Sequence, residues 1–194
     1  IHKAVAIGSV SAQGLPKSVS GRCVNLSDAI DTEFFSAQRA HPHQQNCRPI
    51  LLHPARVQID KGHEDILRAA QILRSRGIDF TLYFVGAVDS EGVHRELQKT
   101  IEVSGLGEQV IFLGEKSQLE MRELFSASKM ILLPSRSEGL PRVLLEAQAM
   151  GKPVVAYNCG GMSEAFVPGE SGYLLEPGNY RGLADHVAFL LQNE

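Results

Sequence analysis

Residues 130–147 read MILLPSRSEGLPRVLLEA, and their pattern is the clearest indication of the fold. Its first four residues are apolar, as expected of a strand that is buried on both faces. A polar loop follows, and Pro141 stands where a helix would begin, because its fixed φ suits the first helical position. Apolar residues continue to Met150, and Gly151 ends the helix. The stretch is therefore predicted to be a strand, a loop and a helix.

The same alternation extends outward from this unit, from about residue 48 to the end of the chain. Further strands are predicted at Ile50–Pro54, Phe80–Val85, Val110–Leu113 and Val154–Tyr157, and helices around 66–73 (ended by Gly77), 92–104, 118–127, 141–150 and 183–191. Continuously apolar strands that alternate with helices indicate an α/β, Rossmann-like parallel sheet with helices on both faces. Ligands of such sheets bind beyond the carboxyl ends of the strands. The residues that follow each strand are therefore the candidates for function.

Composition narrows the classes of function. The 194 residues are 43% hydrophobic and 21% charged, with a net charge of −3, so we expect no bulk affinity for nucleic acid. Three cysteines without C-x-x-C spacing support neither a zinc site nor a disulfide framework. No apolar run approaches the roughly 18 to 20 residues that cross a bilayer. We expect a cytoplasmic protein without a metal site and, because the chain begins with Ile1, a fragment of a longer one.

The strongest candidate site follows the strand at 130–133. Free backbone N–H groups at Arg142, Val143 and Leu144 would suit a phosphate. Glu138 would stand at the mouth of the site, and Glu146, two turns into the helix, could accept hydrogen bonds from a ribose diol. The structural alternative places Glu138 near the helix dipole and pairs Glu146 with Arg142. Because Glu146 lies in an apolar run, where an unpartnered carboxylate is costly, a ligand role is favoured.

Two cations form the second candidate site, directly after the strand at 50–54. Arg56 and Lys61 lie five residues apart on one loop, where they could clamp a diphosphate and stabilise its charge as it departs. The alternative is a solvated loop in which Asp60 pairs with one of them. The spacing of the two cations alone favours the solvated loop. Their position directly after a strand adds support for the diphosphate clamp.

Three further loops follow strands at the same edge. Gly160 and Gly161 allow a sharp turn or a close approach, so structural use is expected there, with Asn158 or Ser163 capping the next helix. Gly86 and the segment that ends at Lys116 could line a base pocket or simply turn the chain.

Other motifs are absent or ordinary. The sequence has no P-loop, dinucleotide fingerprint, zinc-protease motif or nucleophile elbow. The linker histidines His41 and His43 are expected to be solvated. His53 and His63 bracket the cationic loop, and packing or capping is expected for both.

Together these residues resemble the C-terminal domain of family 4 glycosyltransferases, which have the two-domain GT-B fold. The family's Glu-x7-Glu motif is matched by Glu138 and Glu146, and its Arg-x4-Lys-Gly motif by Arg56, Lys61 and Gly62. Residues 154–177 are also similar to the family, and the likeness covers roughly 48–193.

The resemblance implies retaining transfer of a sugar from a UDP- or GDP-linked donor, without an obligatory metal or other cofactor. It assigns the diphosphate to Arg56 and Lys61, and its phosphates also to the amides of Val143 and Leu144. The donor sugar would contact Glu138 and the backbone of Gly139 and Leu140. The ribose would bind Glu146, and the base would lie at the segment near Lys116.

The resemblance also divides the chain. Residues 1–35 are similar to the end of the N-terminal acceptor domain, residues 36–47 would be a linker, and residues 48–194 the donor domain. Asp28-Ala29 replaces the family's usual Asn-Gly, and Leu140-Pro141 its commoner Phe-Gly, which could alter the sugar that fits. Because the acceptor half is missing, we expect weak donor binding and little turnover. Peripheral membrane contact would run through that missing half.

Three other functions are weighed against this one. A GT-B epimerase should show other acidic and histidine residues around the same edge, which we do not find. A phosphorylase would need lysine-bound pyridoxal phosphate, which absorbs visible light. A binding protein would keep the nucleotide site without the chemistry.

Overall fold

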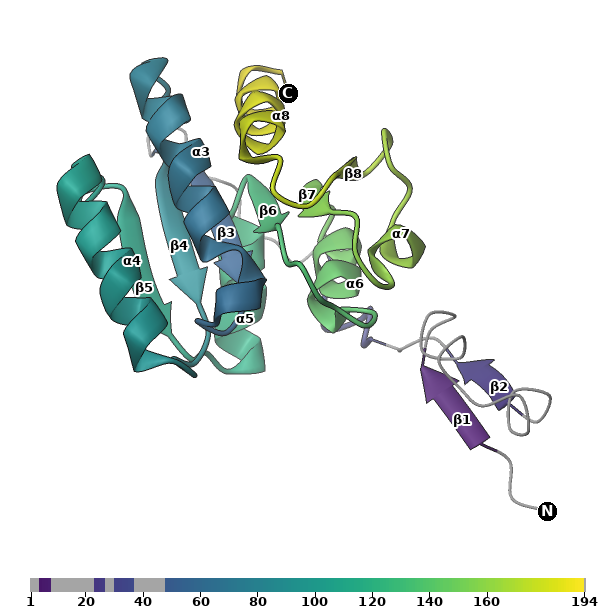
Figure 1. Ribbon diagram of the computed structural model, residues 1–194. Coiled ribbons are helices and arrows are strands. Elements are labelled where there is room, and N and C mark those ends of the chain that lie inside the picture. Colours follow the sequence, from purple (N-terminus) through teal and green to yellow (C-terminus); the bar gives the residue numbers. More distant parts are fainter. Residues whose placement is uncertain (1–3, 8–22, 27–29, 37–47, 194) are drawn as a thin grey trace.

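A six-stranded parallel sheet organises the molecule (Figure 1). The computed structural model describes the backbone of residues 4–7 and 23–26 and all atoms of residues 30–36 and 48–193. The strands of the large sheet are β3 (Ile50–Pro54), β4 (Thr81–Val85), β5 (Val110–Gly114), β6 (Met130–Leu133), β7 (Val154–Tyr157) and β8 (Gly172–Leu175), in the order β5-β4-β3-β6-β7-β8.

Helices cover both faces of this sheet. They are α3 (His63–Ser75), α4 (Glu91–Ser104), α5 (Gln118–Ala127), α6 (Arg142–Ala149), the short α7 (Met162–Ala165) and α8 (Tyr180–Gln192), with a 3₁₀ turn, η2, at Ile59–Lys61. Helices α3, α4 and α8 pack on one face, and α5, α6 and α7 on the other. In the part of the chain that the structure describes, no helix is long and apolar enough to cross a membrane.

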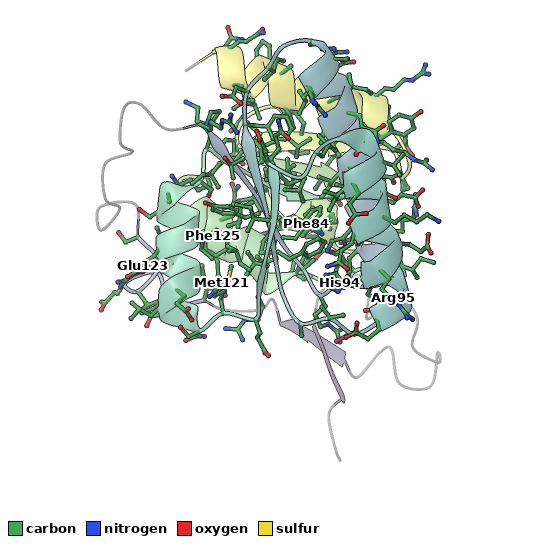
Figure 2. All side chains as sticks on the ribbon, turned by 90° about the vertical axis from the view of Figure 1, so that its left-hand side faces the viewer. Phe84, His94, Arg95, Met121, Glu123 and Phe125 are labelled. Carbon is green, nitrogen blue, oxygen red and sulfur yellow. The ribbon has the colours of Figure 1, made fainter. Side chains whose placement is uncertain are left out.

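Alternation along each strand divides the core into two layers. In β3, Leu51 packs with α3 and α8 while Leu52 packs with α5 and α6, because successive side chains point to opposite faces. Phe84 of β4 and Phe125 of α5 lie on opposite sides of the sheet (Figure 2). Burial on both faces explains why these strands are mostly apolar.

The strand order places a switch point between β3 and β6. From β3 the chain runs outward to β4 and β5, and it then returns to pair β6 with the other side of β3. Ligands of open α/β sheets bind outside the carboxyl ends of the strands at such a switch point, next to the loops that leave the two strands. Here those loops are the cationic loop after β3 and the loop that carries Glu138 after β6.

The predicted α/β fold is confirmed, with three local corrections. The edge strand β8 was not predicted. Pro141 is the N-cap of α6, with an extended ψ of 117°, so the first helical residue is Arg142 rather than Pro141. Neither Asn158 nor Ser163 caps α7, whose N-cap is Gly161 without a side-chain hydrogen bond in the described structure.

Two short strands precede the large sheet in the sequence. β1 (Ala4–Ile7) and β2 (Cys23–Leu26) pair in parallel as a separate two-stranded sheet. Most of the linker at 36–47, including His41 and His43, lies outside the described residues, as do Asp28 and Ala29. Phe35 is buried against Phe125 in the core of the large sheet, with ring centroids 6.1 Å apart.

Candidate functional site

The loops after β3 and β6 meet through a charged pair. Lys61 Nζ lies 3.0 Å from Glu138 Oε1 and donates at 3.2 Å to the carbonyl oxygen of Ser137. The two charged side chains are only 13% and 16% exposed. The structure therefore joins two residues that the sequence assigns to the same site from positions 77 residues apart.

Gly62 permits this close approach. Its φ is +78°, and a Cβ at this position would collide with the carbonyl oxygen of Pro134 at the end of β6. Beside it, the amide of Arg136 donates to the carbonyl of Asp60 at 2.8 Å. The two loops are thus in backbone contact, which a side chain at residue 62 would prevent.

The glycine pair after β7 supports the same loop from the other side. Gly161 donates its N–H to the carbonyl of Gly139 at 2.8 Å, and a Cβ on Gly160 would collide with the carbonyl oxygen of Glu138. Its contacts are with the loop's backbone, so the structural use predicted for this pair is the one observed.

Arg56 lies in a neighbouring cavity of about 240 Å³ at the ends of β3, β4 and β5. The cavity is also lined by Gly86, Lys116 and Val143, so it gathers four of the predicted site residues. Arg56 is 61% exposed and pairs with Asp89 at 2.6 Å. Sequence reasoning missed Asp89, although its position just beyond β4 was a usable signal.

Both cations therefore have carboxylate partners. Asp60 Oδ2 lies 3.5 Å from Lys61 Nζ, as the solvated-loop alternative anticipates, but that lysine also contacts Glu138. Arg56 and Lys61 contact different partners, Asp89 and Glu138. An anion that spans both would have to compete with Asp89 and with Asp60.

The start of α6 offers two free donors, and one predicted donor is lost. Among the described residues, the backbone N–H groups of Arg142 and Val143 have no acceptor, whereas Leu144 donates to the carbonyl of Pro141 at 3.0 Å. The prediction of a free amide at Leu144 is wrong, because Pro141 as the N-cap closes a tight first turn. Leu144 itself is fully buried.

Glu146 lies in the second turn of α6 and is half-buried. Burial raises the pKa of its carboxyl, and the nearby charge of Arg142 lowers it by less. Within the described part of the chain Glu146 forms no ion pair with Arg142, so the i, i+4 pairing of the structural alternative is not made. Leu140, by contrast, is partly buried against the α6 layer of the core.

Lys116 is held by the start of α5. Its Nζ lies 3.1 Å from Glu120 Oε1, and Glu120 completes a capping box with Ser117. The hydrogen bonds from Ser117 hold the pKa of Glu120 at about 2. Besides the cavity beside Arg56, Lys116 lines a second one of about 450 Å³ between α5 and the sheet.

The histidines that bracket the cationic loop pack inside the protein. His53 and His63 are 0% and 2% exposed, with ring centroids 4.4 Å apart, and His53 Nδ1 donates to Leu132 O at 2.8 Å. Burial lowers the pKa of His53 to about 4 and that of His63 to about 2. The expected packing role is confirmed. Across the described ranges, no three His, Cys, Asp or Glu side chains are grouped to hold a metal ion.

Comparison with curated proteins identifies relatives over most of the chain. It is 32% identical over 164 residues to the alpha-D-kanosaminyltransferase of Streptomyces kanamyceticus and 37% identical over 154 residues to the D-inositol 3-phosphate glycosyltransferase of Paenarthrobacter aurescens. These matches cover 84% and 76% of the chain. They cover only 42% and 38% of the relatives, so the chain spans well under half of their length.

Solved structures share the fold. A glycosyltransferase from Rickettsia africae superposes with a TM-score of 0.88 at 24% identity, and Anabaena HepE in complex with UDP and glucose with a TM-score of 0.85 at 21% identity. Each match covers 98% of this chain and about half of the other, 53% and 54%. At these identities the likeness shows the GT-B type of fold.

A family model described as glycosyl transferases group 1 matches residues 34–194, which include all of the large sheet and its helices. The match contains the loops of the candidate site and agrees with the relatives found across the chain. The chain therefore belongs to the group 1 glycosyl transferases.

Proposed function

We propose that the chain is the donor-binding half of a retaining glycosyltransferase, and that the loops after β3 and β6, together with the cavity beside Arg56, hold a nucleoside-diphosphate sugar. The contact of Lys61 with Glu138 carries this proposal, since it puts a cation for the diphosphate beside a carboxylate for the sugar. Because the two side chains are only 13% and 16% exposed, the pair is a preorganised polar site rather than a surface ion pair.

The diphosphate would lie between the two cations and the start of α6. Arg56 and Val143 share one cavity, and the free N–H groups of Arg142 and Val143 add donors at the positive end of the helix dipole. Positive charge at this place stabilises the negative charge that develops on the departing nucleoside diphosphate. Leu144 contributes its side chain to the core and not its amide to the site.

The sugar, the ribose and the base of the donor would be held by other residues around the same loops. Glu138, with the backbone of Gly139 and Leu140, would hold the sugar hydroxyls, and Glu146 would accept hydrogen bonds from the ribose. The half-buried, unpaired state of Glu146 supports a ligand partner, because a carboxylate without one is costly there. The base would lie toward Gly86 and Lys116.

The donor nucleotide and the division of the chain into domains belong to the same proposal. HepE is described in complex with UDP and with UDP-glucose, which supports a UDP-linked donor, with a GDP-linked one as the alternative. Residues 48–194 would form the donor domain, 36–47 the linker and 1–35 the end of an acceptor domain. Transfer would then require that other domain, because the reaction takes place between the two halves.

Thermal unfolding with UDP, GDP, ADP and their sugars tests the proposal. A ligand at 100 times its dissociation constant adds about 2.7 kcal/mol of stability, which shifts the melting temperature measurably. We expect one nucleotide, and the sugar nucleotide that contains it, to stabilise the native chain. Glu102→Gln, a control at an exposed position, should be stabilised to the same extent as the native chain. Glu138→Gln should reduce the shift given by the sugar nucleotide. If no nucleotide stabilises the native chain, the proposal is wrong.

A further inference from the structure

Asp65, in the first turn of α3, carries a buried charge. Its side chain is 1% exposed, and Oδ2 accepts hydrogen bonds from Arg136 Nη2 at 2.7 Å and from Tyr157 Oη at 3.2 Å. Burial and the charge of Asp65 raise the pKa of Tyr157, so its hydroxyl stays protonated as a donor. A buried carboxylate is costly without such partners. Asp65 therefore ties α3 to the loop after β6 and to the end of β7.

Arg136 belongs to the loop that carries Glu138, and this loop is held at almost every residue. Its contacts are Cys159 Sγ to Ser135 O at 3.0 Å, Arg136 N to Asp60 O at 2.8 Å, Lys61 Nζ to Ser137 O at 3.2 Å, and Gly161 N to Gly139 O at 2.8 Å. Two charged side chains from outside the loop take part in holding it, Lys61 and Asp65. Lys61 reaches the loop from the cationic loop after β3 and is 13% exposed, whereas Asp65 lies in the first turn of α3 and is 1% exposed.

A bound diphosphate would compete for only one of these two charges. Lys61 is the proposed phosphate ligand, so its bonds to Ser137 and Glu138 weaken as the phosphate engages it. Asp65 is out of reach of a ligand, and its bond to Arg136 does not depend on what Lys61 contacts. We propose that Asp65 is a positioning residue that acts through Arg136 to hold the Glu138 loop in place for the donor sugar. This inference rests on the proposed function for the identity of the ligand.

Loss of the Asp65–Arg136 bond should weaken binding of the sugar nucleotide more than binding of the free nucleoside diphosphate. Asp65→Asn removes the charge from the bond to Arg136 and so weakens one of the contacts that hold the loop, whose acidic residue is the proposed sugar ligand. The diphosphate is gripped mainly by Arg56, Lys61 and the start of α6, which Asp65 does not touch. We expect affinity for the sugar nucleotide to fall about tenfold, the effect of losing one charge-assisted hydrogen bond, and affinity for the free nucleoside diphosphate to change much less.

Calorimetric titration of the full chain with UDP, UDP-glucose, GDP and GDP-mannose measures this difference. Arg136→Gln should reproduce the effect of Asp65→Asn, and because the Arg136 side chain is 43% exposed, this variant serves if Asp65→Asn fails to fold. Arg136→Lys should recover part of the affinity. Arg68→Gln is the matched control, since Arg68 lies 3.9 Å from Asp65 Oδ1 but pairs with Glu64 on the helix surface.

Hydrogen exchange of the peptide amides at 135–140 gives a readout without any ligand. Exchange should accelerate in Asp65→Asn and Arg136→Gln and stay unchanged in Arg68→Gln. Unchanged exchange, or an equal loss of affinity for nucleotide and sugar nucleotide, would overturn the positioning role. If the native chain binds no nucleotide, the proposed function fails, and the exchange measurement alone decides whether Asp65 positions the loop.

Discussion

Lys61 and Glu138 form an ion pair of 3.0 Å in which both side chains are largely shielded from water. Lys61→Ala leaves Glu138 without its partner and removes a proposed phosphate ligand, so two effects add. We expect affinity for the nucleoside diphosphate to fall by about 10- to 100-fold, which corresponds to one hydrogen bond to a charged group. Calorimetric titration with UDP or GDP measures it.

The matched variant is Glu138→Gln, which keeps Lys61 and the shape of the side chain. Here the free nucleotide should bind about as well as in the native chain, while the sugar nucleotide binds more weakly. An equal loss for both ligands would mean that Glu138 serves only to orient Lys61.

Arg56 and Asp89 are expected to oppose each other. Asp89 holds the Arg56 guanidinium at 2.6 Å, so a diphosphate must displace this carboxylate before it can bind the arginine. Asp89→Asn should therefore raise diphosphate affinity by about three- to tenfold, and Arg56→Gln should lower it, both more strongly at low salt because the pair is exposed. Titrations at two salt concentrations measure this. Weaker binding by Asp89→Asn would instead make Asp89 an orienting partner of Arg56.

The sequence carried most of the fold because the inner strands are continuously apolar. Strands β3, β6 and β7 lie where their apolar runs predict them. The edge strand β8, Gly172–Leu175, has three apolar residues after its glycine, a shorter apolar run than the four residues of β6 or β7. All four residues of β8 pair with β7, and this pairing defines the strand.

The candidate site was predictable only as far as strand ends determine it. Lys61 and Glu138 could be expected together because parallel strands share one carboxyl edge. Asp65 could not, since an acidic residue in the first turn of a helix is ordinary, and only the packing of α3 against Arg136 shows its partner. The error at Leu144 came from a shift of one residue in the start of α6, which decides which amides are free.

Glu146 should lower the stability of the protein at pH 7 and strengthen nucleotide binding. Its folded pKa is raised above the ordinary value of 4.5, so the folded state holds its proton more tightly than the unfolded state does. Stability therefore falls as pH rises from the ordinary pKa through the raised one. Glu146→Gln should be more stable at pH 7, by roughly 1 kcal/mol or less, and should bind nucleotide more weakly. Urea unfolding at pH 4 and pH 7, with titration of UDP, tests both effects, and a less stable variant at pH 7 would contradict the first.

Gly62 should tolerate no side chain, and Gly77 provides the comparison. Both have positive φ, +78° and +71°, but a Cβ on Gly62 collides with Pro134, whereas one on Gly77 has no described atom within 4 Å. Gly77→Ala should cost about 1 kcal/mol from its backbone conformation alone. Gly62→Ala should cost at least about 3 kcal/mol, since the backbone contact must also open. Thermal unfolding measures both, and equal losses would show that the loops adjust freely.

His63 should make the protein sensitive to acid. The pKa of His53 is about 4 and that of His63 about 2 in the folded protein, both below the ordinary 6.5, so the unfolded chain binds more protons between these values. Stability contributed by each neutral ring is present above pH 6.5 and is lost as pH falls below it. From pH 7 to pH 5, each histidine should lower the free energy of unfolding by about 2 kcal/mol.

His63→Phe isolates one of these two contributions. Neither ring nitrogen of His63 has a hydrogen-bond partner in the described structure, and its contacts with His53 and Phe84 are ring against ring, so phenylalanine can replace it without losing a polar contact. Urea unfolding at pH 7 and pH 5 should show that the variant loses about 2 kcal/mol less than the native chain on acidification. The same loss in both proteins would mean that burial does not lower the pKa of His63 in the folded protein.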